Sequence, residues 1–235
     1  MTVMPHIVVG IQARTSSNRF PGKVLELISG KPVIEWVVSN CQTSGFEVFV
    51  LTSNHPSDNE LVEFLAHKKI KFFRGDLNDV LSRFLNFMET YAIDKIIRIS
   101  ADSPLIHPSI IEKLGKVAKK FPEYDLVTNV YPRTYPKGQS VEIISKQSLQ
   151  SIDNLDLPRK NKEHVTSYFY ENPTDFKIYN VRNEQNLELL NLCVDKPSDL
   201  QKIQKYVTSE KLDKRVIPLP WDNFSKSISE SIILR

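Results

Sequence analysis

Cations and hydroxyl groups gather in one short loop near the start of the chain. The loop lies within IQARTSSNRFPGKVL and carries Arg14, Ser16, Ser17, Arg19 and Lys23. The apolar run Ile7 to Ile11 precedes it and is typical of a buried parallel strand. Because open α/β sheets bind ligands at the carboxyl ends of their strands, the loop is predicted to bind an anion, with a polyphosphate as the natural ligand. A basic turn that is simply solvated is the competing interpretation.

The glycines of this loop do not follow the Walker phosphate-binding pattern. That pattern needs an earlier glycine ahead of its Gly-Lys pair and a Ser or Thr directly after it. Here Val24 follows Gly22-Lys23, and the earlier glycine, Gly10, falls within the predicted strand. A simple NTPase is therefore disfavoured.

Two aspartates follow predicted strands and are candidate metal ligands. Asp102 comes two residues after the end of the predicted strand Lys95 to Ser100, which places it at the same edge of the sheet as the basic loop. Asp195 follows the short apolar run Asn191 to Val194 and precedes a helix that other residues are expected to cap. Mg²⁺ prefers one or two carboxylates together with phosphate oxygens and water, which suits phosphoryl or nucleotidyl transfer. A helix cap or turn former is the alternative role for Asp102.

Several other polar residues have a structural interpretation beside a functional one. His164 lies on a predicted helix and is either a satisfied structural histidine or a ligand. Arg74 and Arg83, with two aspartates between them, either form an ion-paired helix start or read a base or ribose. The loop from Tyr131 to Gly138 carries prolines, aromatics and cations, which suits a substrate wall.

The alternation of strand and helix patterns predicts the platform under these residues. Apolar spacing of three and four between Leu77 and Tyr91 is typical of an amphipathic helix, and Ser57 or Asp58 is expected to cap the helix before it. The predicted strands are Ile7 to Ile11, Glu47 to Thr52, Lys71 to Phe73 and Lys95 to Ser100, and the helices cover residues 33–41, 57–65, 77–91 and 108–121. Such alternation predicts βαβ units and a three-layer α/β/α sandwich.

Beyond Tyr124 the pattern changes. Strands are predicted at Leu126 to Val130, Val141 to Ser145, Phe176 to Val181 and Leu192 to Val194, and helices at Lys146 to Asn154, Lys162 to Asn172 and Pro197 to Val207. The last thirty residues are weakly patterned. Pro218, Pro220 and Trp221 indicate an extended arm there, packed on the surface or on a partner subunit.

Composition limits the classes of function. The 235 residues, of which 40% are hydrophobic, are enough for one large α/β domain or for a domain with a small appendage. A net charge of +3 is too small for binding nucleic acid or a membrane by bulk electrostatics. The sequence shows neither a signal peptide nor a transmembrane span, so a cytoplasmic protein is expected. Cys41 and Cys193 lack metal-ligand spacing and are expected to be reduced, structural thiols.

Six segments together resemble one family. In chain order they are IQARTSSNRFPGKVL, FRGDLNDVLSRF, RISADSPLI, RTYPKGQSVEI, KEHVTSYFYENP and CVDKPSDL. They are similar to the SpsF-type cytidylyltransferases of bacterial surface-polysaccharide synthesis and, more distantly, to CMP-Kdo and CMP-sialic acid synthetases. The resemblance implies a GT-A-like nucleotide-diphospho-sugar transferase fold with a mixed, mainly parallel sheet. It also implies a homodimer that uses CTP and Mg²⁺ to make a CMP-activated sugar. Residues 1–207 would then be the nucleotidyltransferase domain, 124–182 its substrate-binding and dimerisation part, and 208–235 a C-terminal arm.

The resemblance implies roles for individual residues as well. Arg14, Lys23 and Asp102 would be catalytic, and Asp102 and Asp195 would bind the metal. The nucleotide-binding residues would be Ala13, Ser16, Ser17, Arg19, Arg74, Arg83 and Ser100. The substrate-binding residues would be Arg133, Lys137, Gln139, Glu142 and His164.

The sequence departs from the family pattern in its loop and in its sugar site. Where the family loop typically reads QARMGSTRLPGK, this chain has Thr15, Ser16, Asn18 and Phe20 in place of Met, Gly, Thr and Leu. The loop thereby loses a flexible glycine. His107 stands where an Asp is common, and Gln139-Ser140 replaces the Leu-Asp of the GLDVE pattern. The change at Gln139-Ser140 bears on the sugar specificity more than on the reaction.

These features favour a Mg²⁺-dependent cytidylyltransferase that transfers CMP from CTP to an acidic sugar, of nonulosonate or Kdo type, with release of pyrophosphate. A sugar or polyol phosphate is the alternative acceptor. A glycosyltransferase that uses a nucleotide sugar is a second class, although it would usually show a DxD motif, and Asp102 is followed by Ser103-Pro104. A non-catalytic nucleotide-binding or scaffold protein is the third. No general base is evident.

Overall fold

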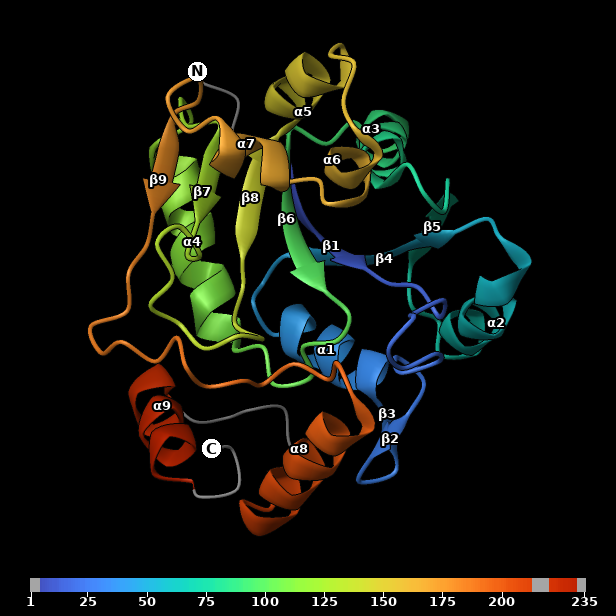
Figure 1. The fold of residues 1–235 in the computed structure, drawn as a ribbon, viewed down its shortest axis with the longest axis vertical. Helices are drawn as coiled ribbons and strands as arrows, with labels where there is room; N and C mark the ends of the chain where they lie inside the picture. Colours follow the sequence, from blue (N-terminus) through green and yellow to red (C-terminus); the bar gives the residue numbers. More distant parts are fainter. Residues whose placement is uncertain (1–4, 213–219, 232–235) are drawn as a thin grey trace.

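A seven-stranded mixed sheet runs through the centre of the molecule (Figure 1). The computed structural model describes residues 5–212 and 220–231. The strand order is β5 (Phe72–Gly75), β4 (Glu47–Ser53), β1 (Ile7–Gln12), β6 (Lys95–Ser100), β8 (Glu142–Ser145), β7 (Leu126–Thr128) and β9 (Ile178–Asn180). Within this described sheet β8 runs antiparallel to both of its neighbours, and the other neighbouring pairs are parallel. The mixed, mainly parallel sheet is confirmed.

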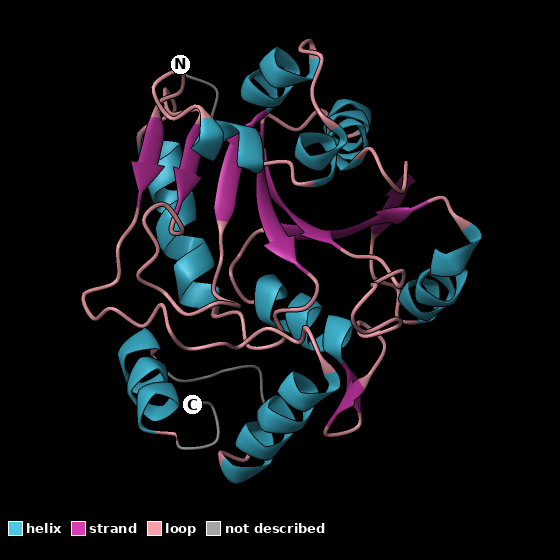
Figure 2. Ribbon diagram, viewed as in Figure 1, coloured by secondary structure: helices cyan, strands magenta, loops and turns pink. Residues whose placement is uncertain are grey.

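Helices cover both faces of the sheet (Figure 2). One face packs against α1 (Val33–Gln42), α2 (Asn59–His67) and α4 (Pro108–Lys120). The other packs against α3 (Val80–Thr90), α5 (Lys146–Asp153) and α7 (Ser167–Glu171), with the short α6 (Arg159–Glu163) beside α3. Successive strand residues point to opposite faces, so that Val8 joins the α3 side and Val9 the α1 side. The three-layer α/β/α sandwich is thus confirmed.

A third apolar cluster lies under the carboxyl-terminal helices. It joins α8 (Pro197–Ser209), α9 (Trp221–Glu230) and the hairpin of β2 (Leu27–Ile28) and β3 (Lys31–Pro32) to the outer side of α1. The expectation of an extended arm is wrong for α9, because Phe224 and Ile228 lie one helical turn apart and are both buried in this cluster. Pro218 lies outside the described residues.

Two other element predictions are wrong in detail. The helix expected over residues 162–172 is divided into α6 and α7, and the β-branched pair Val165 and Thr166 lies at the break. Leu192 to Val194 forms no strand of the described sheet, and only an isolated bridge joins Asn191 to Lys137.

Among the described residues, no helix has the length and apolar content needed to cross a membrane.

Candidate active site

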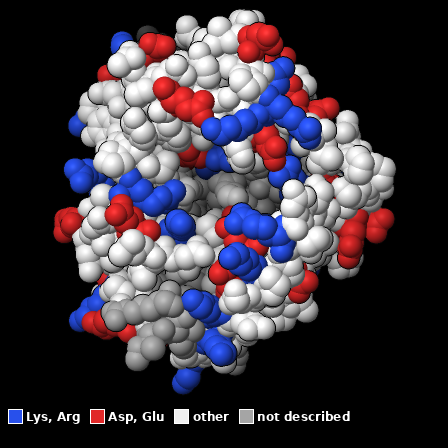
Figure 3. Space-filling model, in the orientation of Figure 1, with Lys and Arg blue, Asp and Glu red and all other residues white. Residues whose placement is uncertain are grey.

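A cavity of about 300 Å³ opens at the carboxyl ends of β1 and β6. The chain passes from β1 to β4 and β5 on one side and then to β6 on the other, so these two strands flank a topological switch point, where α/β sheets bind ligands. Figure 3 shows a hollow in the middle of this face with Lys and Arg side chains around it. The predicted site residues that line the cavity are Ala13, Arg14, Ser17, Arg19, Lys23, Arg83, Ser100, Asp102, His164 and Asp195.

Asp58 holds the basic loop against the sheet. It ends the single turn η1 (Pro56–Asp58) and is fully buried. Its Oδ1 accepts hydrogen bonds from the backbone N–H of Thr15 at 2.7 Å and from the Thr15 hydroxyl at 2.8 Å, while its Oδ2 accepts from Thr52 and Ser53. Farther along the loop, Gly22 adopts a φ of +72° and its N–H donates to the Thr15 carbonyl at 2.9 Å. Asp58 therefore anchors the loop through Thr15. It was expected as a possible cap of α2, but its carboxylate makes no capping hydrogen bond to that helix.

We expect Asp58→Asn to lower the thermal stability and to raise the KM for CTP, the nucleotide that the family resemblance implies. An amide presents one acceptor oxygen in place of two, so buried donors on Thr15, Thr52 or Ser53 lose their partner, at about 1–3 kcal/mol for each group. For a chain of this size that corresponds to a fall in Tm of roughly 2–4 °C per kcal/mol. Calorimetry and steady-state kinetics measure the two effects. An unchanged KM for CTP in a folded variant would separate Asp58 from the loop.

The same carboxylate gives the protein an acid-sensitive contribution to stability. Burial raises the pKa of Asp58, but hydrogen bonds from Ser53 and Thr15 outweigh this effect and hold the pKa below its ordinary value. Because the folded-state pKa is below that of the unfolded chain, the stabilisation is fully present above the unfolded pKa and is lost as the pH falls through the folded pKa. Wild type should therefore lose more stability than Asp58→Asn on acidification.

Lys23 connects the two predicted metal ligands. Its Nζ donates to Asp102 Oδ2 at 2.7 Å and to Asp195 Oδ1 at 3.2 Å, and its side chain is only 11% exposed. The backbone supports this arrangement, because the N–H of Val194 donates to the Asp102 carbonyl at 2.8 Å. Burial alone would lower the pKa of Lys23, but its attraction to Asp102 and its hydrogen bonds to Asp102 and Asp195 raise the pKa above the ordinary value. The ammonium is therefore charged at neutral pH.

The two aspartates fit a divalent cation that is shared with a phosphate ligand. Their oxygens already converge on one positive charge, the Lys23 ammonium. Among the described residues, no three His, Cys, Asp or Glu side chains gather closely enough to hold an ion by themselves. Mg²⁺ commonly takes one or two carboxylates and completes its shell with phosphate oxygens and water. Asp102 and Asp195 are therefore suited to a metal that binds together with a triphosphate.

The remaining loop cations also have acidic partners. Arg14 Nη2 lies 2.7 Å from Glu163 Oε1 of α6, and Arg19 Nη2 lies 3.0 Å from Asp195 Oδ1. The hydrogen bond from Arg14 holds the pKa of Glu163 below its ordinary value. A phosphate that binds Arg14 would therefore compete with Glu163 for the guanidinium.

Arg83 lines the cavity but is occupied by the backbone. Its Nε donates to the carbonyl of Asp76 at 2.9 Å, and its Nη1 lies 3.4 Å from the carbonyl of Leu51. Burial lowers the pKa of Arg83 to about 10, so it stays charged at neutral pH. The start of α3 is capped separately, by Asp79 Oδ1 accepting from the Ser82 N–H at 2.9 Å. Arg83 therefore does not form an ion pair at the start of α3.

Some predicted site residues lie outside this cavity, namely Ser16, Arg74, Arg133, Lys137, Gln139 and Glu142. Arg74 donates from Nε to the Ser53 carbonyl at 2.7 Å and so holds the turn after β4. Arg133 donates to Ser140 Oγ at 3.0 Å. Gln139 is fully buried and links the backbone atoms of Leu105 and His107, which is a structural role. The ligand contacts of these six residues stay predictions.

Polar residues that the sequence reasoning did not assign complete the cavity. They are Gln12, Asn18 and Arg98. Arg98 lies on β6 two residues before Ser100, so both side chains point to the same face of the sheet. The sequence itself could have indicated Arg98, because a charged residue inside an otherwise apolar strand is uncommon unless it is paired or functional.

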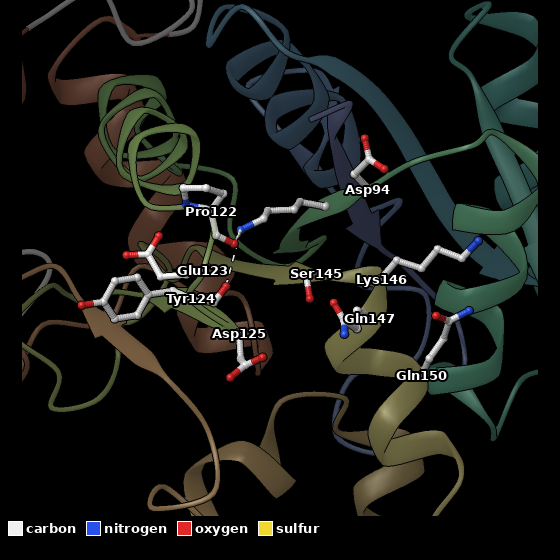
Figure 4. A pocket seen from close by; sticks show the side chains of 10 residues that line it. Asp94, Pro122, Glu123, Tyr124, Asp125, Ser145, Lys146, Gln147 and Gln150 are labelled. Atoms are coloured by element: carbon white, nitrogen blue, oxygen red, sulfur yellow. Dashed lines mark hydrogen bonds between the residues drawn. The ribbon is translucent and has the colours of Figure 1, made fainter. Parts of the chain in front are cut away.

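A larger cavity, of about 460 Å³, lies near the opposite end of β6 (Figure 4). Its charged lining residues are Asp94, Lys95, Glu123, Asp125 and Lys146. Lys95 Nζ is already bonded to the carbonyl of Pro122 at 2.8 Å. Because carboxylates outnumber cations there, this cavity disfavours a triphosphate, and the cavity at the carboxyl ends of β1 and β6 is the better candidate.

Comparison with known proteins identifies the family. The sequence model of a family described as cytidylyltransferase matches residues 8–216. The spore coat polysaccharide biosynthesis protein SpsF of Bacillus subtilis is 26% identical over 183 residues, which cover 74% of each chain. A solved cytidylyltransferase from Leptospira borgpetersenii superposes with a TM-score of 0.86 at 26% identity, over 97% of this chain and 99% of that one. A CMP:2-keto-3-deoxy-manno-octonic acid synthetase solved with CTP shares the fold, with a TM-score of 0.67 at 20% identity over 87% and 99%. The chain therefore belongs to the cytidylyltransferase family.

Proposed function

We propose that this enzyme transfers CMP from CTP to an acidic sugar, in a reaction that requires Mg²⁺. The observation that carries the proposal is the position of Lys23, whose ammonium joins Asp102 and Asp195 beside the basic loop. The fold shared with a synthetase that binds CTP supports the choice of nucleotide, and the similarity to SpsF supports a role in polysaccharide synthesis. The sugar is proposed to be a 3-deoxy-ulosonic acid of nonulosonate or Kdo type.

In the proposed reaction the sugar's hydroxyl oxygen forms a bond to the α-phosphorus of CTP. The bond from that phosphorus to the bridging oxygen breaks, pyrophosphate leaves with the electron pair, and the hydroxyl proton passes to water. Lys23 and Arg14 would offset the charge that develops on pyrophosphate. Mg²⁺ held by Asp102 and Asp195 would supply Lewis-acid withdrawal of charge from the α-phosphate.

The proposal extends to the organisation of the chain. Residues 1–207 would form the catalytic domain, with 124–182 contacting both the sugar and a second copy of the chain in a homodimer. The described part of the 208–235 segment supports this division, because α9 packs on α8 and contributes no described residue to the cavity lining. Size-exclusion chromatography with light scattering would test the dimer.

A thermal-shift screen tests the proposed nucleotide. CTP with Mg²⁺ should stabilise the protein by about 2.7 kcal/mol at a hundred times its Kd, and UTP, ATP and GTP should stabilise it less. Stabilisation by UDP-sugars instead would indicate a glycosyltransferase, and stabilisation by none of them would indicate a scaffold. Pyrophosphate release over a panel of acid sugars and sugar phosphates would then identify the acceptor class.

A further inference from the structure

A hydrogen-bonded group of side chains lies at the active-site cavity, and two of its members, Gln12 and Arg98, line the cavity. Arg98 of β6 and Glu142 of β8 are register partners, and Arg98 Nη1 donates to Glu142 Oε2. Arg98 Nε donates to Gln12 Oε1 at 2.9 Å. The second oxygen of Glu142, Oε1, accepts from the Tyr170 hydroxyl at 2.6 Å. Both oxygens of the carboxylate and two nitrogens of the guanidinium are therefore engaged within the protein.

One nitrogen of the guanidinium is left for a ligand. The Glu142 side chain is 5% exposed and does not line the cavity, whereas Arg98 is 17% exposed and does. The hydrogen bonds of Arg98 to other described residues involve Nε and Nη1. Among the described residues, no buried side-chain nitrogen or oxygen lacks a partner, so Nη2 of Arg98 must be accessible. Because Arg98 lines the cavity, Nη2 can donate into it.

The other cationic side chains of the cavity are assigned to the triphosphate or are bonded to the backbone. Arg14, Arg19 and Lys23 belong to the loop that is proposed to bind the triphosphate. The guanidinium of Arg83 is bonded to backbone carbonyls. Of the described Lys and Arg residues that line the cavity, Arg98 is the one left for an anionic group on the acceptor.

The chemistry of the proposed acceptor places its carboxylate near this guanidinium. In a 3-deoxy-ulosonic acid the carboxylate is attached to the carbon that carries the attacking hydroxyl. A group that binds the carboxylate must therefore lie close to the α-phosphorus, and Arg98 stands on the strand that leads through Ser100 to Asp102. Guanidinium and carboxylate form strong, charge-assisted hydrogen bonds with a defined plane.

We propose that Arg98 binds the carboxylate of the acceptor sugar, and that Glu142, Gln12 and Tyr170 hold the guanidinium in position. The inference rests on the proposed function, and it names the residue that makes an acid sugar preferred over a neutral one. Glu142 then acts from the neighbouring strand as a positioning residue for Arg98 and does not itself face the sugar. Pairing with Glu142 fixes the plane of the guanidinium, and Nη2 is kept for the substrate.

The test compares the acid sugar that wild type accepts with its C1 carboxamide in a pyrophosphate-release assay. Wild type should prefer the acid by about 100-fold in kcat/KM, the size expected for a charged hydrogen bond. In Arg98→Met the acid should lose about 100-fold and the carboxamide less than about 3-fold, so that the preference disappears. The loss should be in the KM for the sugar, with the KM for CTP within about 3-fold of wild type.

Two further variants keep the outcome interpretable. Arg98→Met leaves a buried carboxylate without its partner, so the double variant Arg98→Met/Glu142→Gln removes both charges and should fold with the same lost preference. Lys113 is exposed on α4, outside the segment proposed to bind the sugar, and Lys113→Met is the control that should retain the preference. A folded double variant that still prefers the acid overturns the role of Arg98 alone. Wild type that accepts sugar phosphates and no acid sugar overturns the proposed function, and with it this inference.

Discussion

Lys23→Met should reduce turnover by about 100- to 1,000-fold while leaving the fold intact. The ammonium is proposed to offset charge on the departing pyrophosphate, an interaction that strengthens as the transition state forms. Methionine keeps the buried, unbranched stem of the side chain, so packing in this 9% exposed position is largely retained. Pyrophosphate release and thermal unfolding measure the two effects.

The same variant has a second effect that loss of folding would not produce. Asp102 Oδ2 and Asp195 Oδ1 both accept hydrogen bonds from the Lys23 ammonium, which therefore competes with a divalent cation for these oxygens. Without it, Mn²⁺ or Mg²⁺ should bind more tightly in the absence of nucleotide, and calorimetric titration would show this. Lys113 is exposed on α4, and Lys113→Met is the matched control. Turnover within 10-fold of wild type would remove Lys23 from the catalytic residues.

Local sequence patterns were sufficient to predict the platform of the site. The apolar runs of β1, β4 and β6 indicate strands that are buried on both faces of the sheet. Their alternation with helices predicts that these strands are parallel. Contacts between distant segments are different in kind. Lys23 and Asp195 are 172 residues apart, and no local spacing indicates that they meet. Their association was predicted from the position of Asp195 after a short apolar run, as for Asp102, together with the resemblance to a family.

The residues that the sequence misplaced or missed share one property. Asp58 looks like a helix cap by its position, yet its carboxylate binds Thr15 from another segment. Glu142 is predicted to face the sugar, yet its carboxylate pairs with Arg98 of the neighbouring strand and does not line the cavity. In each case the side chain could point in more than one direction from its backbone position. Tertiary contacts select that direction, so it is beyond the reach of a pattern in one chain.

The charges of the cavity suggest why a metal ion would be needed. Arg14, Arg19 and Lys23 each have a carboxylate partner within 3.2 Å. Within each pair the positive and negative charges largely cancel, so the loop offers little net positive charge to a triphosphate. Binding a polyanion there requires either that the pairs separate or that an additional cation is bound. Asp102 and Asp195 provide the oxygens for such a cation.

Asp102→Asn should therefore abolish most turnover and also remove the effect of Mg²⁺ on CTP binding. The amide keeps the size and shape of the side chain but is a much weaker ligand for a hard divalent cation. We expect kcat to fall by about 1,000-fold, in line with the loss of a charge-stabilising group in the transition state. CTP without metal should bind the variant at least as well as wild type, because one negative charge near the phosphates is gone.

Thermal shifts with CTP, with and without Mg²⁺, distinguish this metal-binding role from a structural one. In wild type the added metal should increase the stabilisation by CTP, and in Asp102→Asn it should not. Asp156 is exposed, and Asp156→Asn should behave as wild type in both assays. A folded Asp102→Asn protein that keeps the Mg²⁺ effect would show that the metal is bound elsewhere. In that case Asp102 would act on Lys23 alone, through the 2.7 Å hydrogen bond between them.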